Sequence, residues 1–183
     1  ERLVHARAGR FLRALHDLPF RSADEMPLST AYTMRMDAWL DRAADCMSAA
    51  AILWVRSRAL EAREFISAQQ RRPCHRDFSP RNWLVEAAHP YSPPGIIDFE
   101  HSRPDLLVLD FYRLWSEVWP GRPDLRRAFL EGYGRELTAG EEETLERHSP
   151  FIALTTVVWS IEHDDREFEL RGWDELRRLG MPE

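Results

Sequence analysis

The chain has 183 residues, of which 44% are hydrophobic and 31% charged, so it can bury a core of its own and is neither disordered nor fibrous. Its formal net charge is −6, which argues against a broad basic face for nucleic acid. The longest strongly apolar run, residues 49–55, is too short to cross a bilayer, and Cys46 and Cys74 offer no disulfide framework, so we expect a cytoplasmic protein without a membrane partner.

Apolar residues at helical spacing predict the first helices. One repeat covers residues 4–15 and should end before Pro19, and residues 19–28 are typical of a loop. A longer periodic stretch, residues 36–66, predicts two helices with a break near Ser48.

The period changes near residue 72, because Pro73 and Pro80 do not allow a helix to continue. Strand-like runs at 83–85 and 95–99 predict a small hairpin, whose long connection at 86–95 is rich in proline.

After Asp110 the pattern is helical again. Asp110 itself is expected to cap the next helix, with support of the preceding loop as the alternative. Residues 138–141 match a capping box. The remaining helices are predicted at 111–118, 125–133, 144–161 and 167–179. The sequence therefore predicts a mainly α fold with a small β-hairpin insert.

The most informative motif is "CHRDFSPRNWLV", residues 74–85. His75, Arg76 and Asp77, with Asn82 five residues after the aspartate, match the H-R-D-x-x-x-x-N spacing of kinase catalytic loops. Asp98 and the phenylalanine after it follow on the next strand, where a kinase places a metal-binding D-F-G aspartate.

Phosphoryl transfer explains these residue types. A carboxylate must orient the acceptor hydroxyl and accept its proton, which suits Asp77. Oxygen ligands must hold Mg²⁺ against the phosphates of the nucleotide, which suits Asn82 and Asp98 and would suit zinc poorly.

These motifs resemble the aminoglycoside phosphotransferase and choline kinase group of small-molecule kinases, within the protein-kinase-like fold. The resemblance extends to "FLRALHDLP", "GIIDFEHS", "DLLVLDFYRL" and "FLEGYGREL". It implies that Asp77 is the catalytic base, that Asn82 and Asp98 bind Mg²⁺, that His75 and Asp110 are structural residues at the site, and that ATP or GTP is the phosphoryl donor.

Departures from the pattern refine this interpretation. Glu100 replaces the glycine of D-F-G, which is more similar to a small-molecule kinase than to a protein kinase. Ser79 occupies the position where protein kinases have a lysine near the γ-phosphate, so other groups must neutralise that charge. Arg76 is often glycine in the antibiotic kinases.

The family's amino-terminal lobe, with its phosphate-binding lysine, should precede residue 1, and this chain contains no lysine. The resemblance therefore implies that residues 1–183 are a carboxy-terminal lobe of an α+β kinase-like fold, with the catalytic loop at 74–85 and the metal-binding strand at 95–100. We expect this lobe to require an amino-terminal lobe for nucleotide binding and to be nearly inactive alone.

An acidic segment near the end of the chain could recognise the substrate. It contains Glu162, Asp164, Asp165, Glu167 and Glu169, with Trp159 beside it. Such a cluster is usually a solvated face, but near a kinase site it would attract an amine-bearing acceptor, such as an antibiotic or a metabolite. Trp159 could offer a cation–π face.

Two other functional classes stay open. The pairs His16-Asp17 and His163-Asp164 are compatible with a helical HD-type metal phosphohydrolase. The missing lobe is also compatible with a non-catalytic, kinase-like binding module.

Overall fold

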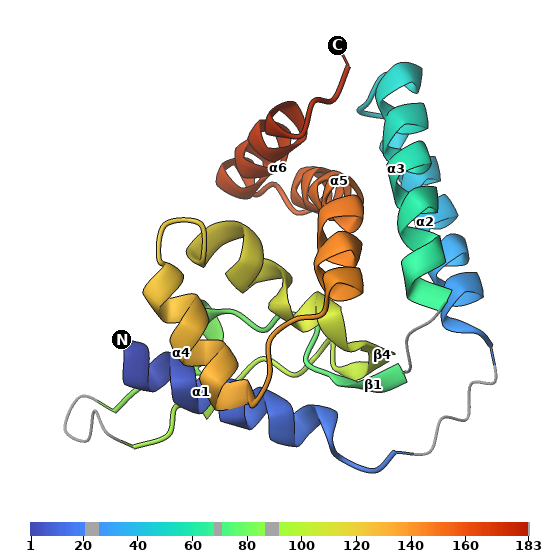
Figure 1. Cartoon of the computed structure of the whole chain (residues 1–183). Helices are drawn as coiled ribbons and strands as arrows, with labels where there is room; N and C mark the ends of the chain where they lie inside the picture. The colour runs from blue at the N-terminus through green and yellow to red at the C-terminus, as the bar shows by residue number, and fades with distance from the viewer. Residues whose placement is uncertain (21–25, 68–70, 87–91, 183) are drawn as a thin grey trace. The chain divides into compact units, whose positions relative to one another are not determined.

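The computed structural model of the chain describes residues 1–20, 26–67, 71–86 and 92–182. They belong to two compact units, one made of Glu1–Glu25 and Gln70–Glu141 and the other of Met26–Gln69 and Glu142–Glu183. Most of the described residues are helical and the strands are short (Figure 1), which confirms the predicted mainly α fold with a β-hairpin insert. In the described part of the chain, none of the helices combines the length and the hydropathy that crossing a bilayer requires.

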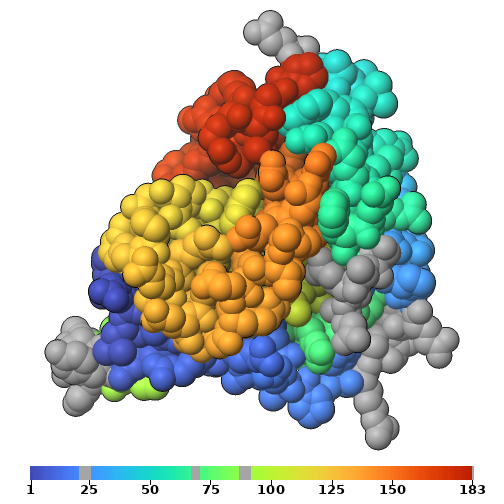
Figure 2. Space-filling view, viewed as in Figure 1, coloured from blue at the N-terminus to red at the C-terminus, as the bar shows by residue number. Residues whose placement is uncertain are grey.

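The first unit is built on two helices, α1 (Arg2–His16) and α4 (Pro123–Tyr133), which lie side by side with adjoining surfaces (Figures 1 and 2). Two glycines allow this approach. A Cβ atom at Gly9 would overlap the backbone of Phe129, and one at Gly132 would overlap the backbone of Ala6. The backbones of α1 and α4 are therefore in direct contact at these two glycines. The helix predicted at 4–15 is present as α1, which ends before Pro19 as expected.

Aromatic side chains fill the core of this unit. Phe78, Phe111, Phe129 and Tyr133 are each at most 2% exposed. Their rings meet edge to face, with centroids 6.1 Å apart for Phe78 and Phe129 and 5.0 Å apart for Phe111 and Tyr133. Because Phe78 belongs to the catalytic-loop motif, the loop is anchored directly in the core.

Two small antiparallel sheets hold the loop on either side. The predicted hairpin is present as β2 (Trp83–Leu84) and β3 (Gly95–Ile96), although residues 87–91 of its connection lie outside the described residues. The second sheet, which the sequence did not predict, pairs β1 (Arg71–Cys74) with β4 (Arg103–Leu106).

The segment after β4 is helical, as predicted, but most of it is not α-helical. A 3₁₀ helix, η2 (Leu107–Phe111), is followed by one π-helical turn, η3 (Leu114–Val118). A short 3₁₀ turn, η1 (Pro80–Asn82), also precedes β2.

The described residues of the second unit form helices and the turns between them, with no strand. It contains α2 (Leu28–Ala43), α3 (Ala49–Ser67) and α6 (Arg166–Arg178), together with α5 (Ala139–Glu162) from Glu142 onward. The predicted break near Ser48 and the predicted capping box are both present: Thr138 N–H donates to the Glu141 carboxylate at 2.8 Å, and Glu141 N–H donates to Thr138 Oγ1 at 3.2 Å. Residues 21–25 of the predicted loop lie outside the described residues.

Candidate active site

The buried carboxylate of Asp110 binds the backbone of the candidate catalytic loop, residues 74–85. Its Oδ2 accepts a hydrogen bond from the backbone N–H of His75 at 2.8 Å, and its Oδ1 accepts one from that of Arg76 at 2.6 Å. Asp110 lies within η2, whereas Arg113 occupies the N-cap position of η3. The expectation that Asp110 caps a helix is therefore wrong, and the alternative, support of the loop, is what the structure shows.

His16, the last residue of α1, contacts the same carboxylate. Its Nε2 lies 3.1 Å from Asp110 Oδ2, and its Nδ1 lies 2.8 Å from the hydroxyl oxygen of Tyr133. Burial raises the pKa of Tyr133 to about 12, so its hydroxyl remains a donor at neutral pH. We therefore assign a chain in which Tyr133 donates to His16 and His16 donates to Asp110, linking α1 and α4 to the loop.

Ligand atoms of His16, Cys74 and Asp110 lie within 4.8 Å of one another, the one such group of three in the described residues. The Cys74 thiol donates to the backbone oxygen of Arg72 at 3.2 Å, and the Asp110 carboxylate accepts from the backbone of the loop and from His16. Burial raises the pKa of the thiol, and the three groups take part in the hydrogen bonds of this core. This group of three includes neither Asp17 nor Asp164, so the described residues assemble no HD-type ligand set.

The imidazole ring of His75 joins the loop to the strand that carries Asp98. His75 Nε2 donates to the backbone oxygen of Ile97 at 2.9 Å, and its Nδ1 accepts from the backbone N–H of Asp77 at 3.3 Å. The ring is fully buried and its centroid lies 4.5 Å from that of Phe99. Both ring nitrogens are thus used in fixing the backbone around Asp77 and Asp98.

Arg76 has a left-handed backbone, with φ of +77°. Glycine adopts this conformation without strain. Here the arginine side chain has a structural partner instead: its Nη1 lies 3.1 Å from Oδ2 of Asp105, which is fully buried on β4.

Asp77 and Asn82 converge, as their spacing suggests. The amide nitrogen of Asn82 donates to the backbone oxygen of Asp77 at 2.9 Å and to its Oδ2 at 3.0 Å. The 3₁₀ turn η1 makes this possible, because Asn82 N–H donates to the oxygen of Ser79 at 2.9 Å and turns the chain back. The Asp77 side chain remains 33% exposed and can be reached by a substrate.

Asp98 follows β3 and is brought towards Asn82 by the strand register. Trp83 pairs with Ile96, and the backbone N–H of Ile97 donates to the oxygen of Asn82 at 3.1 Å. Asp98 is the next residue, is exposed, and has a left-handed backbone with φ of +69°. A non-glycine residue held in this conformation is strained, and such strain is concentrated at functional sites.

Arg113 is the site residue that the sequence analysis missed. Its Nε lies 3.8 Å from Asp77 Oδ1, while its Nη1 donates to Glu117 at 2.9 Å. No motif marks it. The one available signal is its position three residues after Asp110, which places both side chains on one short helical segment.

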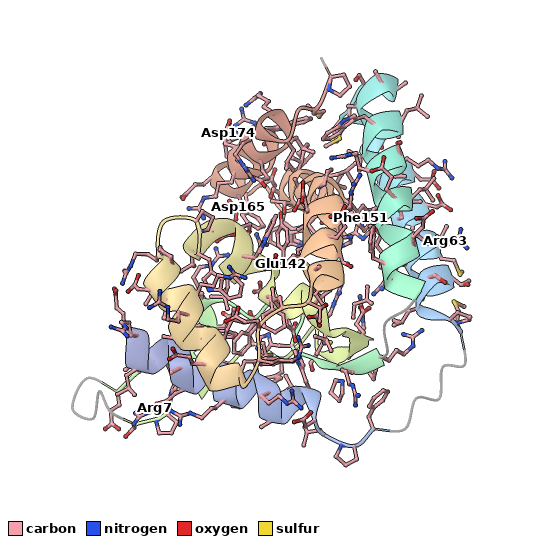
Figure 3. The ribbon with its side chains drawn as sticks, viewed as in Figure 1. Arg7, Arg63, Glu142, Phe151, Asp165 and Asp174 are labelled. Atoms are coloured by element: carbon pink, nitrogen blue, oxygen red, sulfur yellow. The ribbon has the colours of Figure 1, made fainter. Side chains whose placement is uncertain are left out.

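The acidic segment lies in the second unit, and most of its carboxylates have partners there. Glu162 forms an ion pair with Arg42, Asp165 caps α6 by accepting from Phe168 N–H at 3.0 Å, and Glu167 and Glu169 pair with arginines of α6. Figure 3 shows Asp165 at the start of α6. Among the described residues, the exposed side chain of Asp164 makes no hydrogen bond or ion pair. Trp159 is 38% exposed and stacks on His163 with centroids 4.1 Å apart.

Comparison with solved structures shows the fold family. The GDP and kanamycin complex of APH(2")-IIia superposes with a TM-score of 0.70 at 16% identity, covering 97% of this chain and 63% of that one. Plasmodium vivax ethanolamine kinase gives 0.65 at 16% identity over 100% of this chain and 60% of its own. Macrolide 2'-phosphotransferase type I gives 0.62 at 17% identity over 94% and 58%. The chain therefore has a protein-kinase-like fold and spans about 60% of the length of these proteins.

Comparison of sequences gives the family. A search of curated protein sequences finds no significant match to this chain. The model of the phosphotransferase enzyme family, however, matches residues 2–149, a range that contains the loop, Asp98 and Asp110. By this match over most of its length, the chain belongs to the phosphotransferase enzyme family.

Proposed function

We propose that this chain is the carboxy-terminal lobe of a small-molecule kinase, which transfers the γ-phosphoryl group of ATP or GTP to a hydroxyl group of its substrate. One observation carries the proposal: the Asn82 amide donates to the Asp77 carboxylate at 3.0 Å, on the turn beside β3, the strand that Asp98 follows by two residues. This is the arrangement that phosphoryl transfer requires, a base and oxygen ligands in one place.

In this proposal Asp77 orients the acceptor hydroxyl and accepts its proton. Asn82 occupies one side of the carboxylate, and each carboxylate oxygen has two lone pairs, so capacity to accept a further hydrogen bond remains. Asp110 and His75 act indirectly, because they fix the backbone on either side of Asp77 through the hydrogen bonds described above.

The residues present fit a Mg²⁺ ion. The Asn82 nitrogen is committed to Asp77, which turns the amide oxygen to the opposite side of the group, and Asp98 offers an exposed carboxylate. Both are hard oxygen ligands of the kind that magnesium prefers. When bound there, Mg²⁺ would neutralise charge on the nucleotide phosphates.

The nucleotide needs a second set of contacts, which we assign to an amino-terminal lobe. Support comes from the share of related solved chains that this chain spans, 58–63%, and from a sequence without lysine. We therefore expect the isolated chain to be nearly inactive and the complete two-lobe polypeptide to be active.

For the acceptor we propose an amine-bearing alcohol. Two neighbouring structures point this way by name, one a complex with kanamycin and the other an ethanolamine kinase. In this chain Asp164, Glu162 and Asp165 supply carboxylates, and the partly exposed ring of Trp159 suits a cation. The pairing of Glu162 with Arg42 and the capping role of Asp165 leave Asp164 as the strongest candidate.

The test is a nucleotide-turnover assay on the complete polypeptide, with ATP and GTP, against aminoglycosides, choline-like alcohols, amino sugars and neutral sugars of equal size. We expect magnesium-dependent turnover that favours the amine-bearing acceptors and is lost in Asp98→Asn. Turnover with the neutral sugars alone would contradict the acceptor class. Absence of turnover with every acceptor would contradict the kinase proposal and favour a non-catalytic binding module.

A further inference from the structure

We infer that Arg113 is a positioning residue for Asp77, supplying a positive charge beside its carboxylate from outside the loop, whose own Arg76 is paired with Asp105 instead. This inference rests on the proposed kinase function. The loop position at which a protein kinase has lysine is Ser79, whose side chain is 1% exposed and whose hydroxyl finds no hydrogen-bond partner among the described residues. Such a group cannot act as a cation beside the carboxylate.

Arg113 reaches the site from a different segment. Its Nε lies 3.8 Å from Asp77 Oδ1, and the Asn82 amide lies 3.0 Å from Oδ2. The two carboxylate oxygens therefore face two different neighbours, one cationic and one a neutral donor. This arrangement restricts rotation of the carboxylate, and orientation of a reacting group can contribute about a hundredfold to a rate.

The placement of Arg113 is itself well defined. Its side chain is 21% exposed, and Nη1 donates to Glu117 at 2.9 Å on the π-helical turn. Asp110, three residues earlier, holds the backbone of His75 and Arg76. One short segment thus fixes the loop backbone through Asp110 and the side chain of Asp77 through Arg113. π-Helical turns are frequent at functional sites.

The distance of 3.8 Å between Arg113 Nε and Asp77 Oδ1 is too long for a hydrogen bond, so the contact is a charge interaction rather than a bidentate hydrogen bond. A lysine should therefore replace the arginine in part, although it could not do so at a bidentate site. A glutamine at this position is neutral, so it should not replace the function of the arginine.

The experiment compares Arg113→Gln, Arg113→Lys and the matched surface control Arg127→Gln, on the exposed side of α4, in the complete polypeptide. We expect Arg113→Gln to lower kcat about 30-fold with the nucleotide KM changed less than threefold. Arg113→Lys should recover most of this loss, and the control should match the parent. Unfolding curves for each variant separate a loss of fold from a loss of orientation.

A double-mutant cycle decides whether Arg113 acts through Asp77. In the Asp77→Asn background, Arg113→Gln should change the residual kcat less than about twofold, because the carboxylate to be oriented is gone. A further 30-fold loss would overturn the inference and indicate direct contact with phosphate. An active parent with undiminished kcat in Arg113→Gln would overturn the inference alone, whereas an inactive parent would overturn the proposed function and the inference together.

Discussion

At the scale of single residues, the site combines unusual backbone conformations with buried charge. Arg76, which precedes the candidate base, and Asp98, the candidate metal ligand, have positive φ values of 77° and 69°. Neither is glycine, so surrounding contacts must maintain the strain. For Arg76 the contacts are the ion pair with buried Asp105 and the hydrogen bond from its N–H to Asp110.

Arg76→Gly separates these contributions. Glycine removes backbone strain of about 1 kcal/mol, but it leaves the Asp105 carboxylate buried with one partner fewer, at a cost of about 3 kcal/mol. We therefore expect a net loss of about 2 kcal/mol in the free energy of unfolding, measured by urea denaturation. Adding Asp105→Asn should restore most of it. A single variant more stable than the parent would show that strain outweighs the ion pair.

At the scale of elements, the contact between α1 and α4 places His16 and Tyr133 behind the loop. Gly132 lies against the backbone of Ala6, so Gly132→Ala must push the helices apart. We predict a loss of about 3 kcal/mol in the free energy of unfolding. The matched control is Gly140→Ala near the start of α5, where an added Cβ meets nothing within 4 Å and a gain of about 0.5 kcal/mol is expected. Similar effects at both positions would contradict the packing account.

The sequence predicted the elements that have a long local signal. Helical periodicity located α1, α3 and the second half of α2, and the motif spacing predicted that Asp77 and Asn82 converge. The strands β1 and β4 were not predicted, because "RRPC" and "RPDL" are short, contain proline and show no alternation of apolar and polar residues. The sequence also did not predict the left-handed φ of Arg76 or the contact of Arg113 with Asp77, for a different reason. Each depends on residues about 30 or more positions away, which no local pattern records.

At the scale of the whole molecule, the likeness to solved kinases and the family match assign the fold and the family. All the residues that we assign to phosphoryl transfer lie in the first unit, whereas the acidic segment lies in the second. Chemistry and acceptor recognition should therefore respond to different mutations. Changes in the first unit should alter kcat, and changes near Asp164 should alter the KM for the acceptor.

The central claim is that Asp77 is the base of a phosphoryl transfer, and one measurement tests it most directly. This is kcat of Asp77→Asn relative to the parent, in the complete polypeptide with saturating magnesium nucleotide and acceptor. The asparagine keeps the shape of the side chain but cannot accept a proton, so we predict a fall of about 10²- to 10⁴-fold with the nucleotide KM changed less than threefold. A kcat within tenfold of the parent would contradict the account.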